Sequence, residues 1–210
     1  MTTPLSVDPV LQDLSARLIA GATATETLLA WCEEHGLSHG PITVECQQQL
    51  VLSAVPDAVR AALSPAADEP VHYRRVRLVR GSLPLAVAEN WFLPLRLTAD
   101  MNDALRQSKI PFGTVIAPLR PSRRTLMARP QPPIADPAKD PGRPKDPTYR
   151  SQAEIILEHI AVILGGSGTV LALVKEHYLA DLLAVAASPC CRALNGQSER
   201  PVAQIGRLEP

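Results

Sequence analysis

Two pairs of β-type runs, each joined by a short turn, constrain the fold of this 210-residue chain most strongly. Both pairs have a period of two, and short turns between such runs are typical of antiparallel hairpins. The first pair spans 71–80 and 85–93, and the second spans 152–164 and 169–179. The second turn has the sequence Gly165-Gly166-Ser167-Gly168. The pattern therefore predicts an antiparallel sheet.

Helical spacing of apolar residues marks much of the remaining chain. It runs through 10–32 and begins again after Pro56. Thr98 is a good N-cap for a further helix that ends near Ser108. Shorter β-rich runs are expected at 42–46, 114–119 and 124–128. The order helix, hairpin, helix, hairpin predicts an α+β fold with helices packed on one side of an antiparallel sheet.

A proline-rich stretch interrupts this pattern. Seven of the 21 prolines lie within 130–147, and such a composition forms neither a helix nor an interior strand. We therefore predict a single domain over 1–187 with a surface insert at 129–148, followed by a flexible tail at 188–210.

Charge, hydropathy and cysteine spacing argue against several classes of protein. Basic and acidic residues number 21 each, and residues 1–68 hold two basic against eight acidic side chains, so no nucleic-acid partner is expected. No secretory signal or membrane span is visible, which predicts a cytoplasmic protein without a membrane partner. The cysteines and histidines lack metal-ligand spacing, so we expect no metal.

One carboxylate stands out in the last predicted strand. Glu176 follows Val170, Ala172 and Val174 at alternate positions, so it belongs to a mostly apolar face. Carboxylates are rarely buried without a partner, which makes Glu176 a candidate acid, base or hydroxyl-binding group. A solvent-facing position at a strand end is the alternative interpretation.

The first hairpin is rich in arginine. Arg75 and Arg77 share one face of the predicted strand, whereas Arg74 and Arg80 share the other. An inward guanidinium would bind a carboxylate in a rigid, bidentate way. An exposed strand whose arginines protect a sheet edge is the alternative.

Several segments occur in an order that resembles the chorismate lyase (chorismate pyruvate-lyase) family, which shares a superfamily with the effector-binding UTRA domain. These segments are the string 75–81, the strand end Trp91-Phe92-Leu93-Pro94, the turn Ile110-Pro111-Phe112-Gly113, the triplet Arg123-Arg124-Thr125 and the closing strand 173–179.

The resemblance implies a six-stranded antiparallel sheet that encloses a buried ligand pocket and uses no cofactor. It implies catalytic roles for Arg75, at a substrate carboxylate, and for Glu176, at the ring hydroxyl. Phe112 and Gly113 resemble the turn that lines the pocket, and Arg124 matches a supporting arginine.

The identity of the inward arginine stays open in this resemblance. The turn of the first hairpin is about one residue shorter than in the family, so Arg74 and Arg77 are alternatives to Arg75.

The implied activity is the cofactor-independent elimination of pyruvate from chorismate to give 4-hydroxybenzoate, which feeds ubiquinone or related biosynthesis. One alternative is a non-catalytic UTRA-like domain that binds a small molecule. Another is a related lyase acting on a different chorismate-like acid. The expected partner is a small aromatic carboxylate, and the expected state is a monomer or weak dimer.

Overall fold

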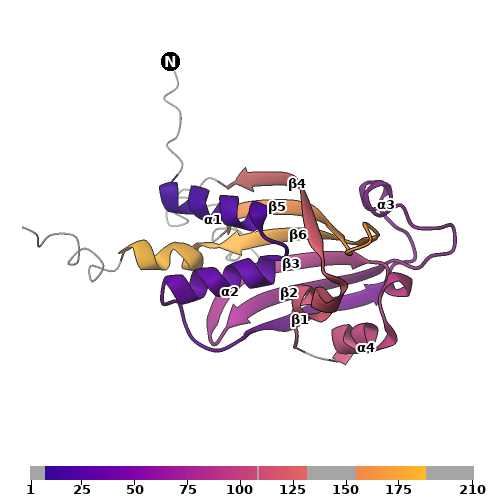
Figure 1. The fold of residues 1–210 in the computed structure, drawn as a ribbon, viewed down its shortest axis with the longest axis horizontal. Coiled ribbons are helices and arrows are strands. Elements are labelled where there is room, and N and C mark those ends of the chain that lie inside the picture. The colour runs from indigo at the N-terminus through magenta and orange to yellow at the C-terminus, as the bar shows by residue number, and fades with distance from the viewer. Residues whose placement is uncertain (1–7, 108, 132–154, 188–210) are drawn as a thin grey trace, which may run out of the picture.

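A computed structural model describes residues 8–107, 109–131 and 155–187 (Figure 1). The described residues form strands β1 (Ile42–Val51), β2 (His72–Arg80), β3 (Leu83–Phe92), β4 (Ser122–Pro130), β5 (Ile155–Leu164) and β6 (Val170–Leu179). The α-helices are α1 (Pro9–Ala20), α2 (Ala24–Glu34), α3 (Asp57–Leu63), α4 (Ala99–Gln107) and α5 (Phe112–Ile116). Three 3₁₀ segments are η1 (Pro94–Arg96), η2 (Ala117–Leu119) and η4 (Ala180–Ala187).

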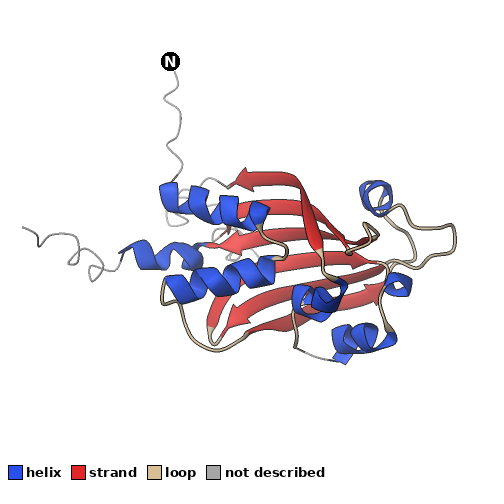
Figure 2. Cartoon of the chain, in the orientation of Figure 1, coloured by secondary structure: helices blue, strands red, loops and turns tan. Residues whose placement is uncertain are grey.

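The strands make one antiparallel sheet in the order β1-β2-β3-β6-β5-β4 (Figure 2). This confirms the predicted α+β fold with a six-stranded antiparallel sheet. The two predicted hairpins are β2–β3 and β5–β6. The first turn is tighter than expected, because Leu83 already belongs to β3 and Gly81 adopts a φ of 58°, a left-handed conformation that glycine tolerates best.

Local capping explains where several helices begin. The side chain of Asp8 accepts a hydrogen bond from Val10 N at 2.9 Å, and Pro9 occupies the first turn of α1. Thr23 caps α2 by accepting from Glu26 N at 3.3 Å. Thr98 accepts from Met101 N at 3.2 Å, so the predicted cap of α4 is confirmed.

Helices cover both faces of the sheet unequally. On one face, α1, α2 and η4 pack over one half of the strands, and α4 and α5 pack over the other half. The opposite face carries α3, whose Val59 and Leu63 pack against Val162 and Leu173. The helices are therefore concentrated on one side, as predicted, except for α3.

The segment 114–119 is a correction to the predicted strands. It lies in α5 and η2 rather than in a strand. Phe112, Val115 and Ile116 have i, i+3, i+4 spacing, and all three side chains are buried against the sheet. Helical periodicity thus dominates this short run despite its β-branched residues.

Two predicted segments lie largely outside the described residues. The tail at 188–210 lies entirely outside them, and of the proline-rich insert at 129–148 only Arg129, Pro130 and Gln131 are described. Arg129 and Pro130 belong to the end of β4.

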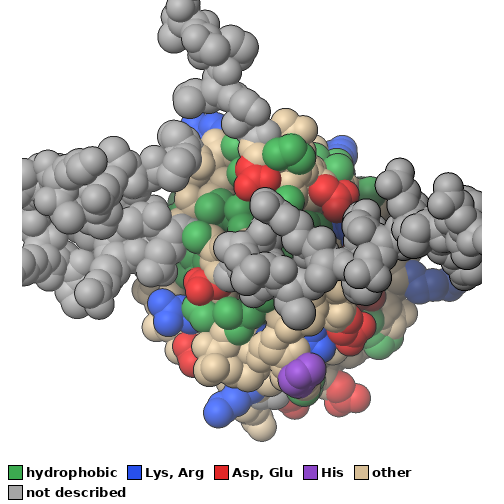
Figure 3. All heavy atoms as spheres, turned by 90° about the vertical axis from the view of Figure 1, so that its left-hand side faces the viewer, with side chains coloured by type: hydrophobic (Ala, Val, Ile, Leu, Met, Phe, Trp, Pro, Cys, Tyr) green, Lys and Arg blue, Asp and Glu red, His purple; other side chains and the backbone are tan. Residues whose placement is uncertain are grey.

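Charges are mixed on the visible surface. Where side chains are not covered by grey atoms, Figure 3 shows acidic and basic groups interspersed with apolar ones. None of the described helices is long and apolar enough to cross a membrane.

Candidate functional site

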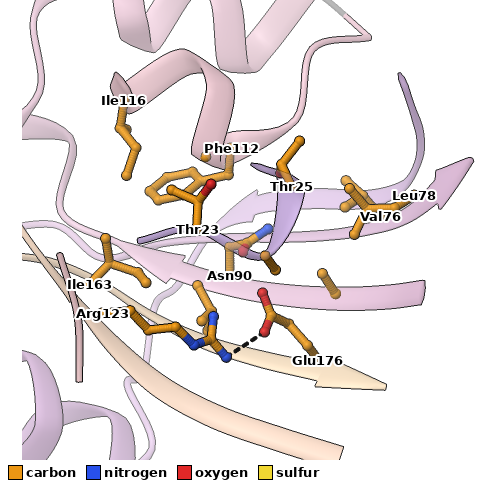
Figure 4. A pocket seen from close by; sticks show the side chains of 14 residues that line it. Thr23, Thr25, Val76, Leu78, Asn90, Phe112, Ile116, Arg123, Ile163 and Glu176 are labelled. Atoms are coloured by element: carbon orange, nitrogen blue, oxygen red, sulfur yellow. Dashed lines mark hydrogen bonds and ion pairs between the residues drawn. The ribbon is translucent and has the colours of Figure 1, made fainter. Parts of the chain in front are cut away.

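A cavity lies on the face of the sheet that carries most helices (Figure 4). It is bounded by the start of α2, by α5 and by side chains from β2 to β6. Its volume is about 30 Å³, room for about two water molecules. Most lining residues are apolar, and the polar ones are Thr23, Thr25, Asn90, Arg123 and Glu176. The predicted buried pocket therefore exists, and it is narrow in this conformation.

Arg123 and Glu176 form a buried ion pair in this cavity. Nη2 of Arg123 donates to Oε2 of Glu176 at 2.6 Å, and the two side chains are 1% and 7% exposed. The hydroxyl of Tyr178, which is fully buried, donates to the same Oε2 at 2.7 Å. No described residue hydrogen-bonds to Oε1, and Figure 4 shows the second carboxylate oxygen directed into the cavity.

The guanidinium of Arg123 has unused donors. Burial is the largest single effect and favours the neutral form, but the charge of Glu176, the hydrogen bond to Glu176 and the contribution of Tyr178 together outweigh it, so the pKa of Arg123 is raised. Nε and Nη1 are buried, and no described residue accepts a hydrogen bond from either. Buried donors are nearly always paired, so two unpaired donors on one buried cation indicate a place for an anionic or polar ligand.

Tyr178 and His159 lie beside this ion pair. Burial, followed by the negative charge of Glu176, raises the pKa of Tyr178 well above its usual value, so its hydroxyl stays a donor. His159 meets the Tyr178 ring edge-on at 5.3 Å between centroids. Burial, followed by the charge of Arg123, lowers the pKa of His159 to about 4, so the imidazole is neutral at pH 7. Tyr178 and His159 are therefore neutral, and Arg123 and Glu176 are the charged members of the cluster.

The wall opposite the sheet depends on a close helix contact. A Cβ added at Gly113 would lie 2.9 Å from Cβ of Thr23, closer than real side chains approach. Glycine at this position lets α5 sit against the N-cap of α2. Thr23 therefore both caps a helix and lines the cavity.

Three of the predicted site residues line the cavity together. Glu176 lies on β6, and Phe112 and Gly113 begin α5. The structure brings these three residues together around one cavity, and their roles with a ligand stay predictions.

Arg75 and Arg124 are placed elsewhere, which corrects the expected arrangement. Nε of Arg75 donates to Oε1 of Gln47 at 3.1 Å, in an exposed contact. Arg124 is exposed, one position along β4 from Arg123. Because successive side chains of a strand point to opposite faces, each of these arginines lies on the face away from the cavity.

Arg74 is the arginine of the 74–77 run that lies on the cavity face. It shares that face with Val76 and is 1% exposed, and burial lowers its pKa. It lines a separate cleft together with Cys46 and Lys109. Arg77, the other open alternative, lies on the opposite face with Arg75.

The sequence analysis missed the most buried contributors to the site. The sequence gives no role to Arg123, which belongs to the triplet Arg123-Arg124-Thr125, or to Tyr178, which alternation places on the same strand face as Glu176. Thr23, Thr25 and Asn90 also line the cavity. Alternation along 122–130 was the available signal for Arg123. It places Arg123 and Arg124 on opposite faces of the strand, but it does not decide which of the two is buried.

Two solved structures have a similar fold. The effector domain of PhnF from Mycobacterium smegmatis aligns with a TM-score of 0.50 and 14% identity, over 77% of this chain and 91% of that domain. PhnF itself aligns with a TM-score of 0.50 and 13% identity, over 76% of this chain and 64% of PhnF. The molecule thus shares its fold with the effector domain of PhnF.

A curated relative places the chain in a family. The uncharacterized protein y4mC of Sinorhizobium fredii (strain NBRC 101917 / NGR234) is 36% identical over 194 residues, covering 86% of this chain and 79% of y4mC. The chain belongs to the same family as y4mC. No protein-family model matches it.

Proposed function

We propose that this domain binds a small hydroxylated carboxylic acid in the cavity between α2, α5 and the sheet. The observation that carries the proposal is the buried guanidinium of Arg123, with two donors that no described residue accepts. A carboxylate is the ligand group whose charge and acceptor geometry fit such donors.

The other lining groups fit the rest of such a ligand. Arg123 and Tyr178 both donate to Oε2 of Glu176. The other carboxylate oxygen, Oε1, can therefore accept a hydrogen bond from a ligand hydroxyl. Phe112, Ile116 and Ile163 offer an apolar surface for a ring. Ligand sites combine a mostly apolar lining with a few placed polar groups in this way.

Binding of a ring requires the cavity to widen. A volume of about 30 Å³ is smaller than any six-membered ring needs. The contact between Gly113 and Thr23 is where α5 and α2 close over the cavity. Separation of these two helix starts would admit a ligand while leaving the sheet unchanged.

The finer proposal is turnover of chorismate to 4-hydroxybenzoate and pyruvate, which the sequence resemblance supports. In this elimination the proton at C4 leaves and its electrons complete the aromatic ring. The C3–O bond breaks with its electron pair on oxygen, and the released enolate takes up a proton at its methylene carbon to become pyruvate. Glu176 would hold the C4 hydroxyl and Arg123 a carboxylate, so the protein's main contribution is orientation in an enclosed site.

Ligand binding without turnover is the second candidate. The fold shared with the effector domain of PhnF favours it. Both candidates use the same cavity and the same ion pair, so one experiment separates them.

Purified protein is incubated with chorismate, and 4-hydroxybenzoate and pyruvate are measured by chromatography. Equal amounts of both products, lost in Arg123→Met and retained in Arg124→Met, would support the lyase. Absence of product, with chorismate raising the melting temperature of wild type but not of Arg123→Met, would support binding alone. Neither turnover nor stabilisation by chorismate or 4-hydroxybenzoate would overturn the proposal.

A further inference from the structure

A second cleft lies where η2 meets the turn between β5 and β6. Its volume is about 380 Å³, within the range of about 300–1,000 Å³ that small-molecule sites occupy. The described residues that line it include two arginines and two hydroxyl side chains but no acid. None of them lines the cavity between α2, α5 and the sheet. The cleft therefore offers positive charge and hydrogen-bond donors at a separate place.

Gly166 holds the two walls of this cleft together. Its N–H donates to the carbonyl oxygen of Leu119 at 2.8 Å, which ties the turn to the end of η2. A Cβ added at Gly166 would lie 3.6 Å from Cβ of Arg120, so the side chain of Arg120 begins beside the turn. The N–H of Gly165 donates to the carbonyl oxygen of Thr169 at 2.8 Å and closes the turn. The walls are thus fixed by backbone contacts before any ligand binds.

Arg120 has a backbone conformation that arginine rarely adopts. It is the C-cap of η2 with φ 49° and ψ 62°, in the left-handed region where glycine is the usual residue. Ser38 and Ser64 also have a positive φ, and their hydroxyls donate to nearby carbonyl oxygens. The guanidinium of Arg120 is exposed and makes no ion pair or hydrogen bond with a described residue. Its donors are therefore available to a ligand.

Ser167 and Thr169 provide a donor from the opposite wall. Their hydroxyl oxygens are 2.8 Å apart, so one hydroxyl donates to the other. Two hydroxyls carry two hydrogens, and the second hydrogen remains for an acceptor in the cleft. Arg96 also lines the cleft, but Glu69 accepts from its Nε and Nη2 at 2.8 and 2.7 Å and compensates its charge. Arg120 is the cation that a ligand would meet.

We propose that this cleft binds a phosphate group between Arg120 and the hydroxyls of Ser167 and Thr169. The oxygens of a tetrahedral phosphate point in several directions, so they can accept from donors on two walls at once. A guanidinium binds two of these oxygens side by side. The group belongs to the free ion or to a small phosphate ester, whose organic part would lie on Leu119 and Leu171. The proposal is independent of the acid-binding cavity.

Thermal unfolding of the full chain tests this site. The melting temperature is measured against increasing inorganic phosphate or phenyl phosphate, with sodium chloride adjusted to hold the ionic strength constant. A ligand that binds the folded state raises the melting temperature, so both probes should raise it above its value in chloride alone. A lower midpoint concentration for phenyl phosphate would assign the site to an ester, and equal midpoints would assign it to the free ion.

Two variants of Arg120 assign the response to the cleft. Arg120→Gln removes the charge and should weaken phosphate binding by about tenfold or more. Arg75→Gln is the matched control, because it removes an exposed arginine that contacts Gln47 on β2, and it should stay within twofold of wild type. Arg120→Gly suits the left-handed backbone, so it should melt no lower than wild type without phosphate and should also lose the response.

Three results would overturn the proposal. The first is a wild-type melting temperature that phosphate does not change beyond the effect of chloride. The second is a wild-type phosphate response in Arg120→Gln or in Arg120→Gly, which would place the bound ion elsewhere. The third is an equal loss of the response in Arg75→Gln, which would mean that overall charge rather than the cleft attracts phosphate.

Discussion

Arg123 and Glu176 meet across an intervening strand. Nη2 and Oε2 lie 2.6 Å apart, yet Arg123 is on β4 and Glu176 is on β6, with β5 between them. Arg123 pairs in register with Ile163 of β5, and Glu176 pairs with His159 of the same strand. Ala161 lies between these two positions on the same face and is fully buried. Its small side chain leaves room for the arginine to pass over β5.

Arg123→Met should abolish acid binding and weaken the fold. Removing one partner of a buried ion pair leaves the other charge uncompensated, which costs about 3–5 kcal/mol. We expect the affinity for a bound acid to fall by about 100-fold or more. Urea unfolding and calorimetric titration measure the two effects.

A double variant separates stability from binding in this case. Arg123→Met with Glu176→Leu replaces both charges by apolar groups, so most of the lost stability should return while binding stays absent. Arg124→Met, on the exposed face, should match wild type in both assays. Wild-type affinity in Arg123→Met would contradict the assignment of this arginine.

Tyr178→Phe should loosen the carboxylate without removing a charge. The variant loses the 2.7 Å hydrogen bond to Oε2 of Glu176, and hydrogen bonds to charged groups contribute about 1.5–3 kcal/mol. We expect an unfolding free energy lower by about that amount and an affinity for hydroxylated acids lower by about tenfold.

Tyr73→Phe is the control for this hydroxyl. Tyr73 donates to Glu89 at 2.8 Å in a partly exposed contact, where water replaces the lost bond. Its loss should cost less than about 1 kcal/mol and leave binding unchanged. An equal loss of stability in both variants would mean that burial of the Tyr178 bond adds nothing.

The sheet was predictable because its signals are local. Alternation and short turns identify β2–β3 and β5–β6, and Thr98 marks the start of α4 within a few residues of sequence. The sequence predicts a strand at 114–119 because its β-branched residues favour strands, whereas burial of Val115 and Ile116 at helical spacing decides the structure.

The ion pair was less predictable because it depends on strand order. Alternation separates Arg123 from Arg124 and Arg74 from Arg75, but it does not say which face carries the helices. The contact of Arg123 with Glu176 also requires β5 to lie between β4 and β6 with Ala161 at the crossing point. Such long-range arrangement is fixed by packing rather than by local propensity.

Arg75→Ala should leave ligand binding within about twofold of wild type. The resemblance to chorismate lyase implied that this variant would lose activity, whereas the structure places Arg75 against Gln47 on the face away from the cavity. Titration with chorismate or 4-hydroxybenzoate decides. Loss of binding in a folded Arg75→Ala protein would show that the strand has another register.

Gly113→Ala should separate α5 from α2. The new Cβ would lie 2.9 Å from Cβ of Thr23, so one of the two helix starts must shift. Overpacking of this kind costs about 1–3 kcal/mol, which thermal unfolding measures. Gly166→Ala, at the exposed turn before β6, should cost less, and an unchanged melting temperature for Gly113→Ala would contradict the close contact.

The stability of the protein should fall between pH 6.5 and pH 4 because of His159. Its folded pKa is about 4, against 6.5 for the free side chain, since burial and then Arg123 oppose protonation while Glu176 favours it. Tyr178, which also faces the ring, stays neutral in this range. In this window the unfolded chain binds a proton that the folded chain does not, so stability is full above pH 6.5 and decreases as the pH falls, by about 3 kcal/mol in total. Urea unfolding at several pH values should show that the free energy of unfolding changes less steeply with pH in His159→Gln than in wild type. Identical slopes in the two proteins would mean that His159 is protonated in the folded protein.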